Sequence, residues 1–258
     1  MRRFWPQADL WSDPPALPGI VAAADISVVG PLTRLARDLE LALSVMAGPD
    51  LLADAGWRLE LPEPPQKALK DFRMAVKLDD PDSEVDRTHQ DKLQALADAL
   101  ARAGATVSNT ARPDIDTRRL HEVYILLLRA ATSGRMPDKD VERWQRAKAE
   151  LTPQDKSYVA QMARGNTLSH RDWLILNNER HAMRFRFAEF FRDWDILLTP
   201  AAASAAWPHD QAGERHERTI KVNGHEVPTT DQLFWAGLSG VVYLPSTVGP
   251  AGILESGL

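Results

Sequence analysis

The 258-residue chain contains no cysteine, and this absence excludes several kinds of chemistry. Disulfide bonds, thiolate zinc sites and cysteine nucleophiles are all ruled out. No run of about 18 apolar residues occurs, so the sequence predicts no membrane-spanning helix. The net charge is −5, with no long run of one sign. Because a nucleic-acid-binding surface needs clustered lysine and arginine, we expect no nucleic-acid partner.

The start of the chain lacks the pattern of a secretory signal. Arg2 and Arg3 are present, but no apolar segment follows them. A signal peptide requires such a segment. Apolar residues make up 44% of the chain and charged residues 26%, which is ordinary for a globular protein. We therefore expect a cytoplasmic protein with no membrane partner.

Short catalytic and nucleotide-binding motifs are also missing. The chain has no Walker A sequence, no G-x-G-x-x-G and no G-x-S-x-G. His216 and His225 flank a predicted hairpin, but no His-x-x-x-His pair occurs, so solvated side chains are the favoured interpretation. We expect no metal ion and no cofactor. By residue chemistry alone, the chain offers no nucleophile with a matching base.

Apolar periodicity predicts alternating strands and helices. Strands are expected at residues 26–31, 72–78, 105–107, 196–198 and 241–248, the last as a buried strand. Helices are expected at residues 35–47, 85–103, 116–132, 138–150, 153–164, 168–192 and 231–238. The order of strand, helix, Gly104 and strand is the sequence form of a right-handed βαβ crossover. Asn223-Gly224 predicts a type I′ hairpin turn within residues 219–227.

The stretch from 190 to 210 is the first place to look for a function. A long helical pattern ends at Asp193, and the apolar run of residues 196–198 follows it. This run predicts a buried strand whose carboxyl end leads into a loop containing Trp207. In α/β sheets, ligands bind outside the carboxyl ends of the strands. The loop after this strand is therefore a candidate wall of a site.

Two polar pairs in the chain have both a structural and a functional interpretation. His209 and Asp210 lie on the loop after that strand, but adjacent residues do not face each other, so a polar loop is favoured over a catalytic pair. His121 and Tyr124 share one helix face and could point into a cleft, although a face packed on its neighbours is the favoured interpretation.

The residues around His170 have a structural explanation. Ser169 is a good N-cap residue, and Asp172 occupies the capping-box position three residues later. We therefore assign no catalytic role to His170.

Three segments, in order along the chain, resemble the amidase-signature hydrolases. They are residues 25–50, with Gly30-Pro31 and Arg34; residues 193–200, which match the pattern D-x-D-hydrophobic-T-P; and residues 234–249. The resemblance implies an α/β fold, here the C-terminal part of a mixed β-sheet core covered by helices, and incomplete. One departure is Leu35, which stands where the family has a capping Ser or Thr and costs the helix about 1 kcal/mol.

The resemblance also implies which residues are missing. The family's chemistry is acyl transfer by a serine that a second serine and a lysine activate, and these lie upstream of Gly30-Pro31. Only 29 residues precede Gly30, and the chain ends at Gly257-Leu258, where the family continues with proline. We therefore expect residues 1–258 to be one partial amidase domain, cut at both ends, with no catalytic residue of its own.

This expected domain has four parts. They are an extended lead-in (1–24), strand and helix units (25–110), a mainly helical part (111–192), and core strands with a hairpin and a short helix (193–258). The candidate substrate-binding residues are Trp207, Asp231, Trp235 and Thr247, although the two tryptophans could equally be core residues.

Two functions remain open at this point. The chain could be the C-terminal segment of a hydrolase that cleaves a carboxamide C–N bond, inactive alone and completed by an N-terminal segment or a separate polypeptide. Alternatively, it could be a non-catalytic remnant or an accessory binding module that keeps half of the fold. Its partners would be a small amide substrate and, through an exposed apolar sheet edge, further copies of the chain.

Overall fold

A computed structural model describes residues 25–28, 30–49, 54–255 and 257 of the chain. The chain divides into two compact units, Met1–Pro64 and Pro65–Leu258. The predicted lead-in of residues 1–24 lies outside the described residues.

The described part of the first unit is built around one helix, α1 (Ala36–Met46). As the sequence predicts, Leu35 provides no side-chain cap at its start. The strand predicted at residues 26–31 is wrong for the residues described there: 25–28, 30 and 31 form no strand, and Ile26 has a φ of 67°. Val29 lies outside the described residues. A strand needs a hydrogen-bonded neighbour, and none pairs with this stretch in the described part of the chain.

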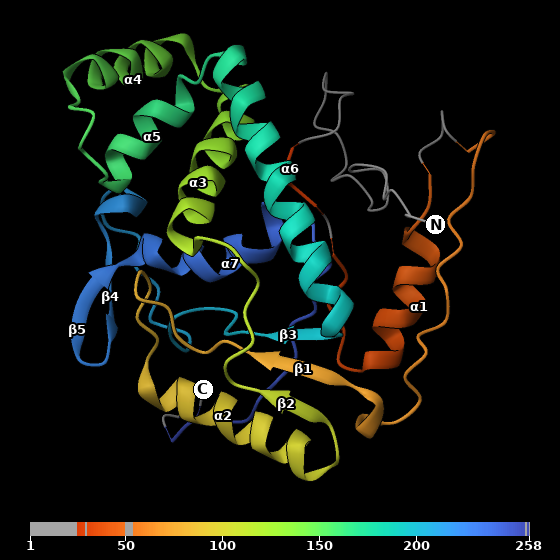
Figure 1. The fold of residues 1–258 in the computed structure, drawn as a ribbon. Coiled ribbons are helices and arrows are strands. Elements are labelled where there is room, and N and C mark those ends of the chain that lie inside the picture. The colour runs from red at the N-terminus through yellow and green to blue at the C-terminus, as the bar shows by residue number, and fades with distance from the viewer. Residues whose placement is uncertain (1–24, 29, 50–53, 256, 258) are drawn as a thin grey trace. The chain divides into compact units, whose positions relative to one another are not determined.

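The second unit contains a three-stranded parallel sheet (Figure 1). Its strands are β1 (Arg73–Val76), β2 (Thr106–Ser108) and β3 (Ile196–Leu198), in the order β2-β1-β3. A short 3₁₀ turn, η1 (Leu69–Asp71), leads into β1. Met74, Ala75 and Val76 are at most 5% exposed, because β1 is central and covered on both faces.

Strand β3 has the predicted bounds but not the predicted burial. It pairs only with β1 and so lies at an edge of the described sheet, where Ile196 is 36% exposed. An apolar run alone does not tell a central strand from an edge strand, since the difference depends on which strands come to lie beside it.

Helix α2 (Arg87–Arg102) connects β1 to β2, which confirms the predicted βαβ unit. Asp86 caps its start by accepting a hydrogen bond from the backbone N–H of Thr88 at 3.0 Å. Leu93 and Ala97 on its buried side pack against Val76 and Leu78. In Figure 1, α2 covers one face of the sheet, and the longer helices lie on the other.

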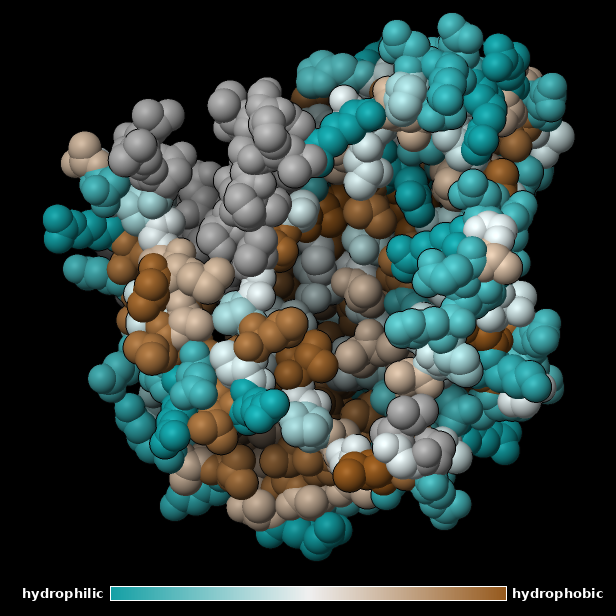
Figure 2. Space-filling model, turned by 180° about the vertical axis from the view of Figure 1, so that it is seen from behind, coloured by the Kyte–Doolittle hydropathy of each residue, from teal (hydrophilic) through white to brown (hydrophobic). Residues whose placement is uncertain are grey.

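Four helices follow β2: α3 (Thr117–Ser133), α4 (Asp138–Glu150), α5 (Tyr158–Asn166) and α6 (His170–Asp193). Asp116, Ser157 and Ser169 cap α3, α5 and α6 with their side chains. A bidentate ion pair joins α3 to α6: Arg119 donates to both carboxylate oxygens of Glu179, each at 2.7 Å. On the face shown in Figure 2, the region of α4 and α5 at the upper right is mainly hydrophilic, as expected for helices that pack through one side only.

A hairpin and a short helix end the described fold. After the turn η2 (Arg215–Glu217) come β4 (Thr219–Val222) and β5 (His225–Pro228), then η3 (Thr229–Gln232) and α7 (Leu233–Gly240). The predicted type I′ turn is confirmed, with φ of 51° at Asn223 and 83° at Gly224.

The buried strand predicted at residues 241–248 is wrong. After α7 the backbone turns, with the N–H of Leu244 bonded to the carbonyl of Ser239, and continues as coil. Val241 and Val242 are buried, but Val248 is 71% exposed. Tyr243 has a φ of 56°, which no strand residue adopts. The apolar run therefore reflects burial beside the end of α7 and not sheet pairing.

Candidate functional site

The three parallel strands end at the same edge of the sheet, which places the segments after them together. The chain passes from β1 to β2 on one side and later returns to β3 on the other. In α/β proteins such a reversal of strand order opens a crevice at the carboxyl ends, where ligands bind. This edge is the candidate site, as the sequence predicts from the stretch around β3.

A buried ion pair follows β1 at this edge. The ammonium of Lys77 lies 2.8 Å from the carboxylate of Asp80, and the two side chains are 9% and 0% exposed. The hydroxyl of Thr117 donates to the same carboxylate at 2.7 Å, and Lys77 also donates to the carbonyl of Asp79 at 2.9 Å. Burial alone would raise the pKa of Asp80, but the hydrogen bonds from Lys77, the backbone of Asp82 and Thr117 outweigh it and hold this pKa below its usual value.

The sequence alone does not assign this pair to the site. It predicts a strand at residues 72–78, which contains Lys77 and ends two residues before Asp80. A signal was available, because Lys77 stands between the apolar Val76 and Leu78 and an acidic residue follows three positions later. A lysine in an apolar run needs a partner if the run is buried.

Three side-chain atoms near this pair are buried and have no hydrogen-bond partner among the described residues: Ser83 Oγ, His121 Nδ1 and Trp235 Nε1. The backbone N–H of Ser83 donates to the carbonyl of Asp80 at 3.1 Å, and the ammonium of Lys77 lies 6.0 Å from the ring centroid of Trp235. Buried polar atoms normally bond to protein or to ordered water. These atoms can therefore bind water or a polar group of a ligand.

His121 and Tyr124 confirm the packed-face interpretation. The His121 ring lies 5.4 Å from the Phe234 ring, and Tyr124 is 7% exposed. Burial lowers the pKa of His121, although the charges of Asp82, Glu122 and Asp80 oppose it. The imidazole is thus held neutral between α3 and α7. Asp80 lies at the start of the same helix α3, where Thr117 donates to it.

The predicted residues Asp231 and Trp235 lie on the turn η3 and on α7, within one helical turn of each other in sequence. Trp235 is 3% exposed, and burial raises the pKa of Asp231. Between them, Gln232 accepts from the backbone N–H of Ala203 at 2.8 Å and donates to Ser204 at 3.0 Å. These bonds tie η3 to the loop that follows β3, so both residues belong to the same edge of the sheet.

Replacing Asp231 with asparagine should stabilise the chain at neutral pH. The folded-state pKa of Asp231 is raised, so its carboxylate form is disfavoured on folding, and this penalty is present above the folded pKa and disappears as the pH falls below the unfolded value. We expect a gain on the order of 0.5 kcal/mol at pH 7, measured by urea unfolding, and almost none at acidic pH.

The exposed Asp91 on α2 gives the matched control. Asp91→Asn should leave the free energy of unfolding unchanged at both pH values. If Asp231→Asn lowered the free energy of unfolding at neutral pH, the proposed penalty on the buried carboxylate of Asp231 would be contradicted. A carboxylate kept at a cost in stability is itself an indication of a functional group.

The other two predicted substrate-binding residues lie on exposed segments. Trp207, on the loop after β3, is 40% exposed, and Thr247 is exposed on the coil after α7. The structure does not bring either of them into contact with Trp235 through any ring interaction or hydrogen bond in the part of the chain that it describes. Their role as substrate contacts stays a prediction.

The remaining histidine candidates take structural or solvated positions. His209 and Asp210 lie on an exposed loop, where Asp210 accepts from the backbone N–H of Ala212 at 2.9 Å. His216 lies in η2 and His225 at the start of β5. Among the residues that the structure describes, histidine, aspartate and glutamate side chains form no group of three that could hold a metal ion.

The capping role predicted for Ser169 is confirmed. The Ser169 hydroxyl accepts from the backbone N–H of Asp172 at 3.1 Å and donates to the carboxylate of that residue at 2.7 Å. His170 stacks on Trp173 with ring planes 6° apart. This cluster begins α6 and needs no catalytic explanation.

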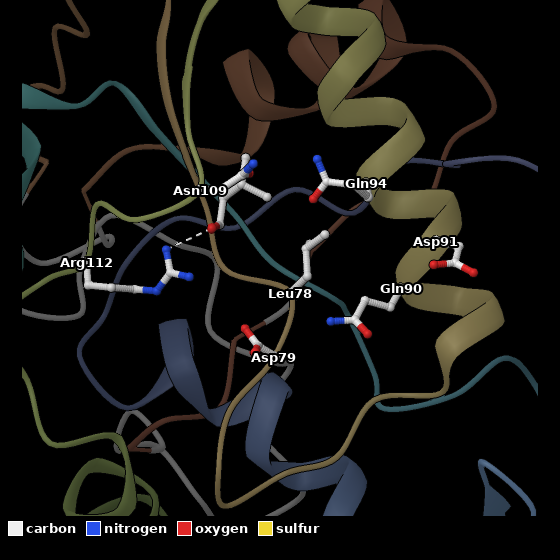
Figure 3. A pocket seen from close by; sticks show the side chains of 8 residues that line it. Leu78, Asp79, Gln90, Asp91, Gln94, Asn109 and Arg112 are labelled. Atoms are coloured by element: carbon white, nitrogen blue, oxygen red, sulfur yellow. Dashed lines mark hydrogen bonds between the residues drawn. The ribbon is translucent and has the colours of Figure 1, made fainter.

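A polar cleft of about 260 Å³ lies at the same edge, on the α2 side of the sheet (Figure 3). Its lining comes from the segment after β1, from α2 and from the segment after β2: Val76, Leu78, Asp79, Gln90, Asp91, Gln94, Asn109 and Arg112. The Arg112 guanidinium donates to the carbonyl of Val76 at 2.8 Å. Val76 and Leu78 face this cleft, whereas Lys77 between them reaches Asp80 and Trp235 on the other side, as the twofold alternation of extended chain requires.

Among the described residues at this edge, no hydrogen bond joins a lysine to a serine, and the buried Lys77 is bound to Asp80. A nucleophilic serine needs a base within hydrogen-bond distance.

No helix in the described part of the chain is long and apolar enough to span a bilayer.

The sequence matches the amidase family model over residues 10–258. Among curated proteins, the chain is similar to an indoleacetamide hydrolase of Bradyrhizobium diazoefficiens, with 25% identity over 237 residues. That alignment covers 89% of this chain and 41% of the relative. The chain therefore spans about two fifths of the length of the curated relative that it matches.

Solved structures agree in fold. A bacterial aryl acylamidase of the amidase-signature enzymes superposes with a TM-score of 0.63 at 15% identity, covering 96% of this chain and 50% of that one. A 6-aminohexanoate cyclic dimer hydrolase gives a TM-score of 0.52 at 17% identity, covering 86% and 47%. At such identities the likeness concerns the fold alone, and it confirms the α/β class predicted from the sequence. The family match over residues 10–258 shows that this chain belongs to the amidase family.

Proposed function

We propose that this chain forms the C-terminal share of a hydrolase that cleaves carboxamide C–N bonds. The observation that carries the proposal is the amidase match over residues 10–258. The edge with Lys77, Asp80 and Trp235 then forms one wall of the substrate site. Asp231 and Trp235 are the substrate contacts on that wall, with Trp207 and Thr247 on the segments that border it.

We further propose that the 258 residues do not hydrolyse amides by themselves. Amide hydrolysis needs a nucleophile, a base and donors for the developing oxyanion. In the described residues Ser83 is the buried serine beside a buried lysine, but its Oγ has no partner and Lys77 is bound to Asp80. The nucleophile would be contributed by a segment or polypeptide outside this sequence.

Aromatic carboxamides are the proposed substrate class. The relatives include an indoleacetamide hydrolase and an aryl acylamidase, whose names refer to amides that carry an aromatic ring. In this chain Trp235 is buried four residues after Asp231, and Trp207 is 40% exposed on the loop after β3, so that an aromatic ring surface is available on that loop. Aromatic rings stack on such surfaces at little cost in conformational entropy. No cofactor takes part in the proposed reaction, and a cytoplasmic location, which rests on sequence alone, is part of the proposal.

The test is a hydrolysis assay with the purified chain. Indole-3-acetamide and acetanilide are incubated with it, and ammonia and aniline release are followed, together with labelling by a fluorophosphonate probe for activated serines. We expect no turnover and no label. Clear turnover with a labelled serine would overturn the proposed inactivity of the isolated chain while supporting the amidase assignment.

A non-catalytic binding module is the second candidate. It is favoured by the buried Lys77–Asp80 pair, which is present although no serine bonds to a base beside it in the part of the chain that the structure describes. Calorimetric titration with indole-3-acetamide separates the two functions. Binding without turnover that is lost in Asp231→Ala is expected for a binding module and also for the C-terminal part of an enzyme. Turnover restored by an added N-terminal amidase segment would then decide for the enzyme.

The apolar edge of β3 is the proposed place for a further polypeptide. Its three residues are Ile-Leu-Leu, it pairs only with β1 in the described sheet, and Ile196 is partly exposed. Unpaired edges of this kind take up additional strands. We expect the isolated chain to self-associate through this edge in light scattering, and a monodisperse monomer would contradict this proposal.

A further inference from the structure

A groove of about 470 Å³ lies far along the chain from the candidate site, among the helices that follow β2. Its apolar lining comes from α3, from both loops that border α5, and from α6: Leu126, Leu151, Pro153, Leu168, Ile175 and Leu176. Ile175 is 57% exposed, whereas Leu176 next to it is 7% exposed and forms the floor. A volume of this size fits a small organic ligand.

Two cations at this groove have no acidic partner in hydrogen-bond contact. Lys148, in the last turn of α4, donates to the carbonyl of Thr167 at 3.4 Å. Arg164 donates to the carbonyls of Asp155 and Thr152 at 2.6 and 2.8 Å. No ion pair within the described residues joins either cation to a carboxylate. Lys148 therefore keeps a positive charge that a ligand can use, whereas the charge of Arg164 already acts on the carboxylate of Asp155.

The one carboxylate that lines the groove is already engaged. Asp172 accepts from the hydroxyl of Ser169 at 2.7 Å as part of the cap of α6. The lining thus carries two cations and one carboxylate beside an apolar floor, which leaves an excess of one positive charge. This combination fits a ligand with an apolar body and an anionic end, because each part meets its complement.

We propose that this groove binds a small amphiphilic carboxylate, with its apolar body on Leu176 and Ile175 and its carboxylate at Lys148. Arg164 adds positive charge to the lining while it holds the loop after α4. The ligand's apolar part covers side chains that water otherwise contacts, which is the source of the affinity. This proposal stands on the groove alone and does not depend on the proposed amide hydrolysis.

Three probes with the full chain test the ligand class. Decanoate carries both parts, decanamide has the same apolar body without the charge, and acetate has the charge without the body. By calorimetry below the micelle concentration, we expect decanoate to bind, decanamide to bind about tenfold more weakly, and acetate not to bind. Failure of decanoate to bind, or equal binding of decanoate and decanamide, would overturn the proposal.

Paired variants test the place. Ile175→Asp should abolish decanoate binding, whereas Leu174→Asp, at an exposed neighbour outside the lining, should leave it unchanged. Lys148→Ala should weaken decanoate about tenfold without affecting decanamide, whereas Arg146→Ala, at an exposed residue of α4, should change neither. Unaltered circular dichroism shows that each variant is folded. If Ile175→Asp changes the oligomeric state and decanoate does not bind, the groove is a contact between chains and the proposal is wrong.

Discussion

Replacing Asp80 with alanine should lower the free energy of unfolding by about 3–5 kcal/mol. The substitution leaves the ammonium of Lys77 buried without its counter-charge, and it also removes the acceptor of the Thr117 hydroxyl. The Lys77 side chain is 9% exposed, so water cannot replace the lost carboxylate without local rearrangement. Urea unfolding followed by circular dichroism measures the effect.

Two further variants separate charge burial from the loss of packing. The double change Lys77→Met with Asp80→Leu should recover most of the lost stability, since replacing both charges with apolar groups leaves nothing unpaired. Glu142→Ala breaks an exposed pair of 3.8 Å with Arg146 and should cost less than about 1 kcal/mol. If Asp80→Ala lowered the free energy of unfolding as little as Glu142→Ala does, the Lys77 ammonium would have to reach water in the variant.

The same pair makes stability depend on pH. The folded-state pKa of Asp80 lies below its usual value, so its contribution is present at neutral pH and is lost as the pH falls through the folded pKa. The wild-type chain should therefore lose its advantage over the double variant in acid.

Gly237→Ala is the second change with a large expected effect. A Cβ atom at residue 237 of α7 would lie 2.3 Å from the ring of Tyr124, far inside contact distance. Tyr124 is itself buried on α3, so the ring has little room to move. We expect a loss of about 1–3 kcal/mol in the free energy of unfolding from this overpacking.

Gly240, three residues later on α7, provides the control. A Cβ atom there has no neighbour within 4 Å, so Gly240→Ala should be neutral or should stabilise the helix by up to about 1 kcal/mol. In a chain that already carries Tyr124→Ala, the further change Gly237→Ala should lower the free energy of unfolding very little, because the clashing ring is gone. Equal stabilities of the two single alanine variants would rule out the close contact between α3 and α7.

Local patterns were sufficient to predict most elements of the second unit. Helices α2 and α3 have apolar stripes and capping side chains, α6 begins at the capping Ser169, and the Asn223-Gly224 turn requires the positive φ angles that it adopts. The wrong strands, at residues 241–248 and at the described residues of 26–31, share one cause. Each is an apolar run, but a strand exists only where another strand bonds to it, and that partner is set by the rest of the fold.

The candidate site could be predicted in place but not in content. The rule about the carboxyl ends of strands pointed to the loop after β3, and Gln232, which stands beside Asp231 in sequence, bonds to that loop. The sequence did not show that Lys77 and Asp80 are buried together, nor that Thr117, from a helix 37 residues later, bonds to the same carboxylate. Such contacts depend on tertiary packing, which has no periodicity to detect.

The position of β1 at the centre of the sheet also has a consequence for how the chain folds. Its partner β2 comes soon after α2, whereas β3 is separated from β1 by more than a hundred residues, as the hydrogen bond from Arg73 to Asp195 over 122 positions shows. Closing so long a loop is entropically slow. On the ribosome, β1, α2 and β2 can assemble first. The edge of β1 that later pairs with β3 then stays unpaired until α3 to α6 and β3 have been synthesised. The time between these two pairings is the interval in which this strand is open to the wrong neighbour.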